Sequence, residues 1–217
     1  MKIKWWGHAC FAITAQNGKV LLTDPYPPSI GYLPIADSVD IVTISHDHFD
    51  HNSVDGLRGE PKIIKEAGRH LVDGFEITGI ESLHDDAGGS KRGKNLIFSI
   101  MVDGLRIVHL GDQGITLTPG QLEQIGQADI VMIPVGGTYT VDAAQACQIV
   151  QQLNPKVVLP MHYQTEALTF NIAPVSEFTK LFAPGQVQTV DSAELQLDTL
   201  PAEQKVYVLQ YVNQAAV

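Results

Sequence analysis

The chain has 217 residues, 44% hydrophobic and 18% charged, which excludes a disordered protein. A net charge of −10 disfavours nucleic acid or an anionic membrane surface as the main partner. Cys10 and Cys147 make no disulfide framework, and no stretch reaches the length of a membrane span. We therefore expect one soluble, cytoplasmic domain over residues 1–217, without a signal peptide.

The first part of the chain predicts short strands. Residues 3–6, 10–14 and 19–23 have the required patterns, and Asn17-Gly18 marks a hairpin tip between the second and the third. A run rich in Ile, Val and Thr over residues 40–45 predicts a buried strand. Further on we expect a short helix over residues 53–57 and a strand over 62–64.

A dense polar motif follows the strand at residues 40–45 and reads Ser-His-Asp-His-Phe-Asp-His. Along extended backbone, side chains two apart point the same way, so His46 and His48 can bind one metal ion. Asp50 and His51 are adjacent and diverge, so they can reach a second ion. Three imidazoles and one carboxylate suit zinc, manganese or iron rather than calcium. The alternative is a polar surface loop that is rich in histidine by chance.

The second part of the chain alternates strands with helices, which is typical of an α/β fold. His84, Asp112 and His162 each follow a predicted strand or hairpin. Thr140 is the expected N-cap of the longest helix. Strands are expected over residues 76–83, 95–102, 105–110, 130–134, 157–160, 187–190, 194–197 and 206–211, the last three closing a second sheet, and helices over 119–125, 141–153 and 175–182.

Four short stretches accompany the histidine motif: Trp6-Gly7-His8-Ala9, Thr23-Asp24-Pro25, His109-Leu110-Gly111-Asp112 and Pro160-Met161-His162-Tyr163. Together with His-Asp-His-Phe-Asp-His they resemble the metallo-β-lactamase superfamily of metal-dependent hydrolases. The branch they are most similar to includes ascorbate-phosphate lactonase and, more distantly, N-acyl-phosphatidylethanolamine phospholipase D. The resemblance implies a four-layer αββα sandwich, with metals at one edge of the two sheets.

The same resemblance implies a binuclear site with two divalent transition-metal ions, zinc before manganese or iron. His109 competes with His84 as a ligand, but its odd offset from Asp112 favours a core or bracing role. The implied ligands are His46, His48 and His84 for one ion, Asp50, His51 and His162 for the other, and Asp112 as the bridge.

In such a site a water that bridges the ions becomes hydroxide and attacks a carbonyl or phosphoryl centre. Asp50 can accept a proton, and Asp24 is expected to brace the metal loop. His8 is either a satisfied polar residue near a strand end or a catalytic group that orients substrate or stabilises an oxyanion. We expect a hydrolase that cleaves an ester, lactone or phosphodiester of a small metabolite, which can be anionic.

Two other functions are weighed against this one. A metal-binding scaffold that acts through a partner would keep the ligands without turnover, and a nuclease of the superfamily would favour a basic surface. Specificity is expected in the loops at residues 26–32, 85–94 and 136–139. In the second of these, Lys91, Arg92 and Lys94 are either solvated or bind an anion such as phosphate. The sequence does not indicate an oligomeric state.

Overall fold

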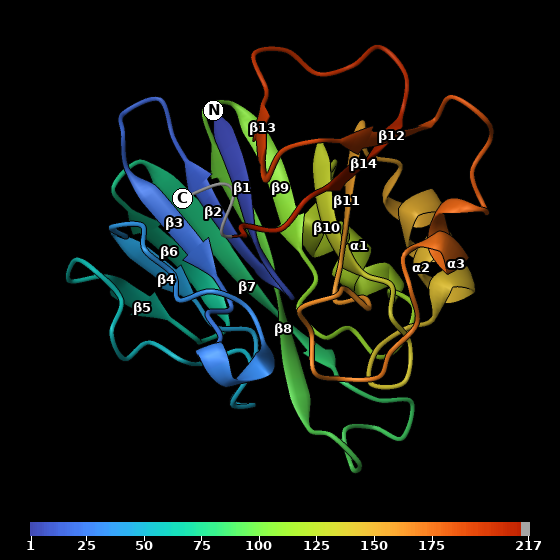
Figure 1. The fold of residues 1–217 in the computed structure, drawn as a ribbon, viewed down its shortest axis with the longest axis horizontal. Coiled ribbons are helices and arrows are strands. Elements are labelled where there is room, and N and C mark those ends of the chain that lie inside the picture. Colours follow the sequence, from blue (N-terminus) through green and yellow to red (C-terminus); the bar gives the residue numbers. More distant parts are fainter. Residues whose placement is uncertain (214–217) are drawn as a thin grey trace.

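Two β-sheets pack face to face in the computed structural model, which describes residues 1–213 (Figure 1). The expected domain extends to residue 217, and its last four residues lie outside the described part. The β1, β2 and β3 strands of the first sheet are antiparallel, and the next two are parallel to β3. Within residues 1–213 this sheet has the order β13 (Glu194–Gln196), β1 (Lys2–Gly7), β2 (Cys10–Thr14), β3 (Val20–Thr23), β4 (Ile41–Thr43), β5 (Lys62–Ile64).

The second sheet is larger and mixed. Its order over the described residues is β12 (Val187–Val190), β14 (Lys205–Leu209), β11 (Val157–Met161), β10 (Ile130–Pro134), β9 (Leu105–His109), β8 (Lys94–Val102), β7 (Phe75–Leu83), β6 (Gly68–Val72). The neighbours β6, β7, β8 and β9 run antiparallel to one another. The neighbours β9, β10, β11, β14 and β12 run parallel to one another. Sequence patterning missed β6, because no side chain in it is fully buried.

Helices α1 (Pro119–Ile125) and α2 (Ala143–Leu153) lie beside the second sheet, and α3 (Ser176–Thr179) packs on α2 (Figure 1). Both longer helices begin with a capping box. The predicted N-cap Thr140 is wrong. Asp142 takes that role because its carboxylate accepts the Gln145 N–H at 2.8 Å. None of the helices in residues 1–213 has the length and apolar character that a membrane crossing requires.

The outer face of the first sheet is covered by residues 24–39, which include the 3-10 helix η1 (Pro28–Ile30). Trp6 and Leu22 from the sheet pack there in one apolar cluster with Ile30 and Tyr32. This cover, the two sheets and the helices form four layers. The expected four-layer sandwich of the αββα class is confirmed with one difference in its outer layer, because residues 24–39 cover the first sheet as a loop with one 3-10 turn.

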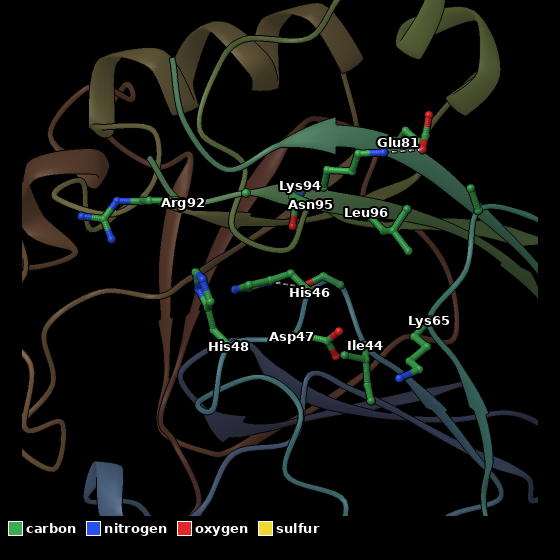
Figure 2. Close-up of a pocket in the computed structure, with 13 residues that line it drawn as sticks. Ile44, His46, Asp47, His48, Lys65, Glu81, Arg92, Lys94, Asn95 and Leu96 are labelled. Carbon is green, nitrogen blue, oxygen red and sulfur yellow. Dashed lines mark hydrogen bonds and ion pairs between the residues drawn. The ribbon is translucent and has the colours of Figure 1, made fainter. Parts of the chain in front are cut away.

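The end of β4 approaches the start of β8 in the other sheet. The Leu96 N–H donates to the carbonyl of Ser45 at 2.9 Å. Figure 2 shows His46 and His48 on one side of a pocket, with Asn95 and Leu96 on the other. This contact holds the loop after β4 against the second sheet, where the strand ends carry the other candidate site residues.

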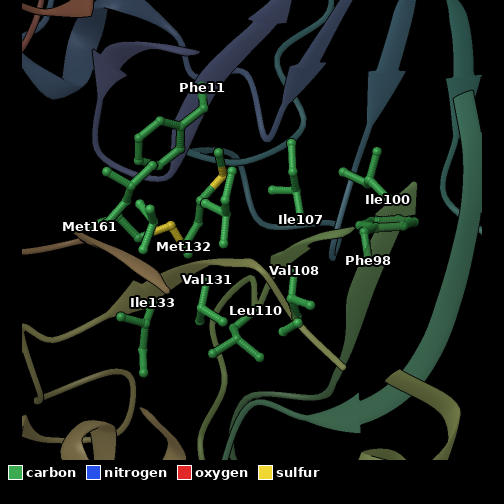
Figure 3. Close-up of a cluster of buried hydrophobic side chains, with 14 of the residues drawn as sticks. Phe11, Phe98, Ile100, Ile107, Val108, Leu110, Val131, Met132, Ile133 and Met161 are labelled. Carbon is green, nitrogen blue, oxygen red and sulfur yellow. The ribbon is translucent and has the colours of Figure 1, made fainter. Parts of the chain in front are cut away.

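The space between the sheets is filled by apolar side chains. In Figure 3, Met132 of β10 points toward Phe11 of the first sheet, whereas Val131 and Ile133 point to the opposite side, where the helices lie. This alternation is that of a strand buried on both faces. Phe98 of β8 is fully buried in the same core. Because burial of one such side chain contributes about 1.5–3 kcal/mol, this core is a major source of stability.

Three expected elements differ in the structure. Residues 53–57 form a loop with one turn at residues 55–56, so the predicted helix there is wrong. The Ser53 N–H donates to the Pro25 carbonyl, which holds this loop against another loop. The helix expected over residues 175–182 is reduced to α3. The strand β13 pairs with β1 in the first sheet instead of closing the second, with Leu195 opposite the buried Ile3.

Candidate metal centre

The loop that follows β4 presents four of the predicted ligands in six residues. The His46 Nδ1 lies 2.9 Å from the Ser45 hydroxyl, which leaves Nε2 free on the other side of the ring. The His51 N–H donates to the carbonyl of His48 at 3.0 Å, so the backbone turns between them. His46 and His48 share one donor group, and Asp50 and His51 share another. The separation is incomplete, because His46 also forms a group with Asp24 and His51, and the ring centres of His46 and His51 lie 4.3 Å apart.

The first donor group consists of His46, His48 and His84. One potential ligand atom from each lies within 4.8 Å of those from the other two. The ring centres of His48 and His84 are 4.9 Å apart, and those of His46 and His48 are 4.5 Å apart. Because His84 directly follows β7, this group joins the β4 loop of the first sheet to a strand end of the second.

The second donor group consists of His8, Asp50, His51 and His162, again with potential ligand atoms within 4.8 Å. His162 directly follows β11, and His8 lies in the turn between β1 and β2. The His8 Nε2 is 3.1 Å from Asp50 Oδ2. The sequence placed His8 near the metal site, and the structure shows that its direct contact is with the Asp50 carboxylate.

Asp112 lies between the two donor groups. Its Oδ2 is 3.2 Å from His84 Nε2, 3.3 Å from His162 Nε2 and 3.4 Å from His51 Nε2. The His46 Nε2 is farther away, at 3.9 Å. Burial acts to raise the pKa of Asp112, but the neighbouring His162 and His51 hold it well below its ordinary value. The carboxylate is therefore ionised where both groups meet.

Asp24 braces both donor groups from the side away from Asp112. Its Oδ2 lies 3.0 Å from His51 Nδ1, and its two oxygens accept the N–H and hydroxyl of Ser45 at 2.7 and 2.6 Å. Ser45 in turn contacts His46 Nδ1. Contacts of this kind fix the tautomer and orientation of a ligand ring. Asp24 thus has the bracing position that the family resemblance implies.

Asn95 and Gly111 set the position of Asp112. The Asn95 Oδ1 accepts the Asp112 N–H at 3.0 Å, and its Nδ2 donates to the Leu110 carbonyl at 2.9 Å. Gly111 has φ +54°, and a Cβ there would lie 2.3 Å from Asn95 Oδ1 and 2.6 Å from the Ser45 Cβ. Only glycine permits this approach. Sequence reasoning missed Asn95, because a single amide near the start of a strand carries no motif.

Three site residues have left-handed backbone conformations, with φ +51° at His8, +36° at Asp24 and +50° at His162. Such angles are uncommon for residues other than glycine and cost about 1–3 kcal/mol each. The His162 N–H donates to the His8 carbonyl at 3.1 Å, which joins two of these positions. Strain of this kind is concentrated at functional sites.

The donor set fits a metal on the chemistry of its buried atoms. Burial, with the neighbouring His162, lowers the pKa of His8 to about 4, and burial with His51 lowers that of His46 to about 3. These rings are neutral at pH 7 and can offer lone pairs. Buried polar atoms normally have partners. Within residues 1–213, those without one include His8 Nδ1, His46 Nε2, His51 Nε2, His84 Nδ1, His162 Nδ1 and Asp112 Oδ1.

A cavity of about 410 Å³ opens beside the two groups. Phe49 and Phe170 were missed by sequence reasoning, because no motif marks them. His8 is fully buried and is not among the described lining residues. The cavity is lined by Asp47, His48, Phe49, Asp50, His84, Arg92, Asp112, Tyr139, His162 and Phe170.

Two of the three expected specificity loops reach this cavity, through Arg92 and Tyr139. The loop at residues 26–32 does not line it. Tyr26 and Tyr32 are each 3% exposed and pack in the outer layer over the first sheet. That loop is rich in aromatic residues because it covers a sheet face.

His109 has a core position. Its Nε2 lies 2.9 Å from the Ala9 carbonyl, and its Nδ1 accepts the Gly111 N–H at 3.3 Å. Both ring nitrogens are therefore engaged, and His109 belongs to neither donor group. His84 is the histidine that meets His46 and His48. His70 lies on β6 and also belongs to neither group.

A match to a known family covers all the donor residues of the candidate metal centre. Residues 2–162 match the family described as the beta-lactamase superfamily domain. This stretch is more than half of the 217 residues and includes both donor groups and Asp112. The chain belongs to the metallo-β-lactamase superfamily. The resemblance carried by the histidine motif and its accompanying stretches is thereby confirmed at the level of the superfamily.

Curated relatives and a solved structure support the same membership. A UPF0173 metal-dependent hydrolase from Methanoregula boonei is 31% identical over 76% of this chain and 83% of its own length. Another from Staphylothermus marinus is 30% identical over 82% of this chain and 90% of its own. A crystal structure from Thermotoga maritima, assigned to the Zn-dependent hydrolases of the metallo-β-lactamase superfamily, is 39% identical. The match covers 97% of this chain and 99% of the Thermotoga maritima chain, with a TM-score of 0.84.

This member of the metallo-β-lactamase superfamily is a metal-dependent hydrolase. Its clusters of His and Asp side chains can bind metal. Both clusters lie where strands end, and the cavity opens beside them, so a substrate can reach the donor atoms.

Proposed function

We propose that the protein hydrolyses an ester, lactone or phosphodiester bond in a small molecule, using two divalent transition-metal ions. The observation that carries this proposal is the position of Asp112. Its carboxylate touches both donor groups, so one side chain can serve two ions. Imidazole with carboxylate favours zinc, with manganese or iron as alternatives.

Seven residues are proposed as ligands. The Nε2 atoms of His46 and His51 support the assignment, because both are buried without a hydrogen-bond partner. The Nε2 atoms of His84 and His162 lie at the same Asp112 oxygen. The proposed ligands are His46, His48 and His84 for the first ion, Asp50, His51 and His162 for the second, and Asp112 for both.

When bound, the ions would make hydroxide available at neutral pH by lowering the pKa of water, and would polarise the scissile bond. Asp50 lines the cavity and is proposed to accept the proton that the nucleophile releases. Burial acts to raise its pKa, but the hydrogen bond from His8 and the neighbouring His51 lower it below its ordinary range. Asp50 is therefore an ionised acceptor at neutral pH.

His8 is proposed to act through Asp50. The low pKa of its ring keeps it neutral, and with the proton on Nε2 it donates to Asp50 Oδ2. That bond fixes which way the carboxylate faces without adding a charge. His8 is therefore a positioning residue for the proton acceptor.

We also propose that residues 1–217 form one domain that acts in the cytoplasm. Strands from both sheets contribute to one continuous apolar core, which supports a single folding unit. The two cysteines are free, with Cys10 buried and Cys147 partly buried, which is typical of a reducing compartment.

Elemental analysis tests the ligand assignment. Protein purified without chelator is expected to hold about two transition-metal ions per chain. The His48→Ala variant should lose metal, whereas the matched His70→Ala variant should keep it, because His70 lies on β6 outside both groups. One ion per chain would contradict the binuclear assignment, and none after adding zinc or manganese would overturn the proposal.

A substrate screen tests the reaction. The metal-loaded protein is expected to cleave members of a panel of lactones, p-nitrophenyl esters and bis(p-nitrophenyl) phosphate. Turnover should stop with a chelator and return with zinc or manganese. Full metal loading without turnover on any of the three bond types would contradict hydrolysis and support the metal-binding scaffold instead.

A further inference from the structure

The cavity beside the donor groups contains one basic side chain among its described lining residues, Arg92. Three carboxylates, those of Asp47, Asp50 and Asp112, line the same cavity. A guanidinium in such surroundings is expected to pair with one of them. Within residues 1–213, however, no acidic oxygen comes within ion-pair distance of Arg92. Its charge is therefore available to something that enters the cavity.

Its basic neighbours are engaged elsewhere. Lys91 Nζ lies 2.9 Å from Asp86 Oδ1, and Lys94 Nζ lies 3.4 Å from Glu81 Oε1. Figure 2 shows Lys94 extending to Glu81, whereas Arg92 extends in the opposite direction. Only the middle residue of the basic cluster therefore faces the cavity.

Two features hold Arg92 in place. Its guanidinium carbon lies 4.4 Å from the centre of the Tyr139 ring, in a cation–π contact. The loop that carries it is built on Asp85. The Asp85 Oδ1 accepts the N–H groups of Ala87 and Gly89 at 2.8 and 2.9 Å, and Oδ2 accepts those of Lys91 and Arg92 at 3.0 and 2.7 Å.

Two further lining residues, Phe49 and Phe170, are apolar and aromatic. Phe49 is 60% exposed, which is unusual for a phenylalanine, and its ring centre lies 6.2 Å from that of Phe170. Both rings line the cavity. Apolar walls with a few fixed polar groups are typical of small-molecule sites. The two rings provide a surface for an apolar part of a ligand.

We propose that Arg92 is the anion-binding residue of this site, and that the substrate carries a carboxylate or phosphate group next to an apolar part. The planar guanidinium presents paired N–H donors that match both anions. The apolar part packs on Phe49 and Phe170, and the scissile bond lies toward Asp50 and Asp112. This inference rests on the proposed hydrolytic function, because it names the class of substrate for the same site.

Matched substrates test the role of Arg92. We would compare p-nitrophenyl succinate with p-nitrophenyl butyrate, which has the same carbon chain without the carboxylate. In the Arg92→Gln variant, KM for the succinate ester is expected to rise about 10- to 100-fold, the range for hydrogen bonds to a charged group. The value of kcat, and both constants for the butyrate ester, should stay within about twofold of the native values.

Two further variants serve as controls. Lys91→Gln removes a neighbouring charge that faces Asp86, and it should leave both esters unaffected. Arg92→Lys keeps the charge but loses the paired donors, and it should give an intermediate KM. Equal changes for both esters in Arg92→Gln, or the same effect in Lys91→Gln, would overturn the proposal.

A binding measurement separates this inference from the proposed reaction. Calorimetry with phenylacetate, phenylphosphonate and benzyl alcohol needs no turnover, so it applies even if no ester is cleaved. At least one of the two anions should bind the native protein and lose about tenfold or more in affinity in Arg92→Gln, and the stronger binder identifies the carboxylate or the phosphate class. Anion affinities that Arg92→Gln does not change, or no binding of either anion, would overturn the role of Arg92.

Discussion

Between the two sheets, Phe11, Phe98 and Met132 are buried apolar side chains in a dense core. At the strand ends, His51 and Asp112 are just as buried, yet both have polar atoms without a partner in residues 1–213. Four strands, β4, β7, β9 and β11, contribute to both regions, because each carries buried apolar residues and leads into donor residues. In these four strands the middle stabilises the fold, and the residues after the end carry the reactive groups.

The two regions also make contributions of opposite sign to the stability of the fold. A buried polar atom without a hydrogen bond costs about 1–3 kcal/mol, and each left-handed residue at the site adds a similar cost. Each large side chain buried in the core contributes about 1.5–3 kcal/mol in the other direction. The donor groups at the strand ends therefore destabilise the fold until a bound group satisfies their unpartnered polar atoms. Burial of apolar side chains in the core must offset that cost.

The largest expected effect comes from a change at the edge. Asp50→Asn removes the proposed proton acceptor, and kcat should fall about 100- to 10,000-fold in assays with saturating metal. Asp55→Asn is the matched control, because Asp55 is exposed and a few residues away. If the kcat of Asp50→Asn equalled that of Asp55→Asn, Asp50 would not be the proton acceptor.

A change in the core should reduce stability and leave metal binding by the folded molecules unchanged. Phe98→Ala is expected to lower the free energy of unfolding by about 3–5 kcal/mol, because the cavity it leaves is lined by buried apolar neighbours. Urea titration measures this loss. Molecules that stay folded should keep their metal content. Loss of metal in proportion to stability would show that the two regions are not separable.

A residue that joins the two regions should have an intermediate effect. Asp24→Asn leaves a neutral amide next to His51 and Ser45, and metal affinity should fall about 10- to 100-fold. Competition with a chelating dye measures the affinity. Asp40→Asn is the control, because Asp40 also accepts a backbone N–H but contacts Lys19 and Val20 away from the site. Equal affinities in the two variants would exclude a bracing role.

The smallest effect is expected from pH. The pKa of His8 is lowered from 6.5 to about 4 and that of His46 to about 3. In this window the unfolded chain binds more protons at these two histidines than the folded chain, so their contribution to the stability of metal-free protein should fall as pH drops below about 6.5. His51, whose pKa is raised well above its ordinary value by Asp112 and Asp24, contributes in the opposite direction. The loss between pH 7 and 6 is less than about 1 kcal/mol per histidine. Urea midpoints should show a shallower pH dependence in His8→Gln, and an unchanged dependence would contradict the assignment.

Most strands were predictable because their signals are local. The hairpin turns, the apolar run of β10 and the capping residues of α1 each lie within a few residues of what they determine. The errors arose where a distant partner decides. The loop at residues 53–57 is attached through Ser53 to Pro25 in another loop, and β13 joins β1 across most of the chain.

The candidate site divides in the same way. His46, His48, Asp50 and His51 were found together because one loop carries them. His84 was preferred to His109 because of the odd offset of His109 from Asp112, and in the structure both ring nitrogens of His109 contact backbone groups. The basic cluster shows the limit most clearly. Nothing in the local sequence distinguishes Arg92 from its lysine neighbours, because the difference depends on Asp86, Glu81 and Tyr139.

One feature of the donor groups extends beyond chemistry. His8 and the loop after β4 belong to the first sheet, whereas His84, Asp112 and His162 belong to the second. An ion held by either group is therefore a cross-link between the two halves of the sandwich. Such an ion would resist sliding of one sheet over the other. A mechanical force that shears the two sheets apart would have to break metal–ligand bonds before it could separate the apolar core.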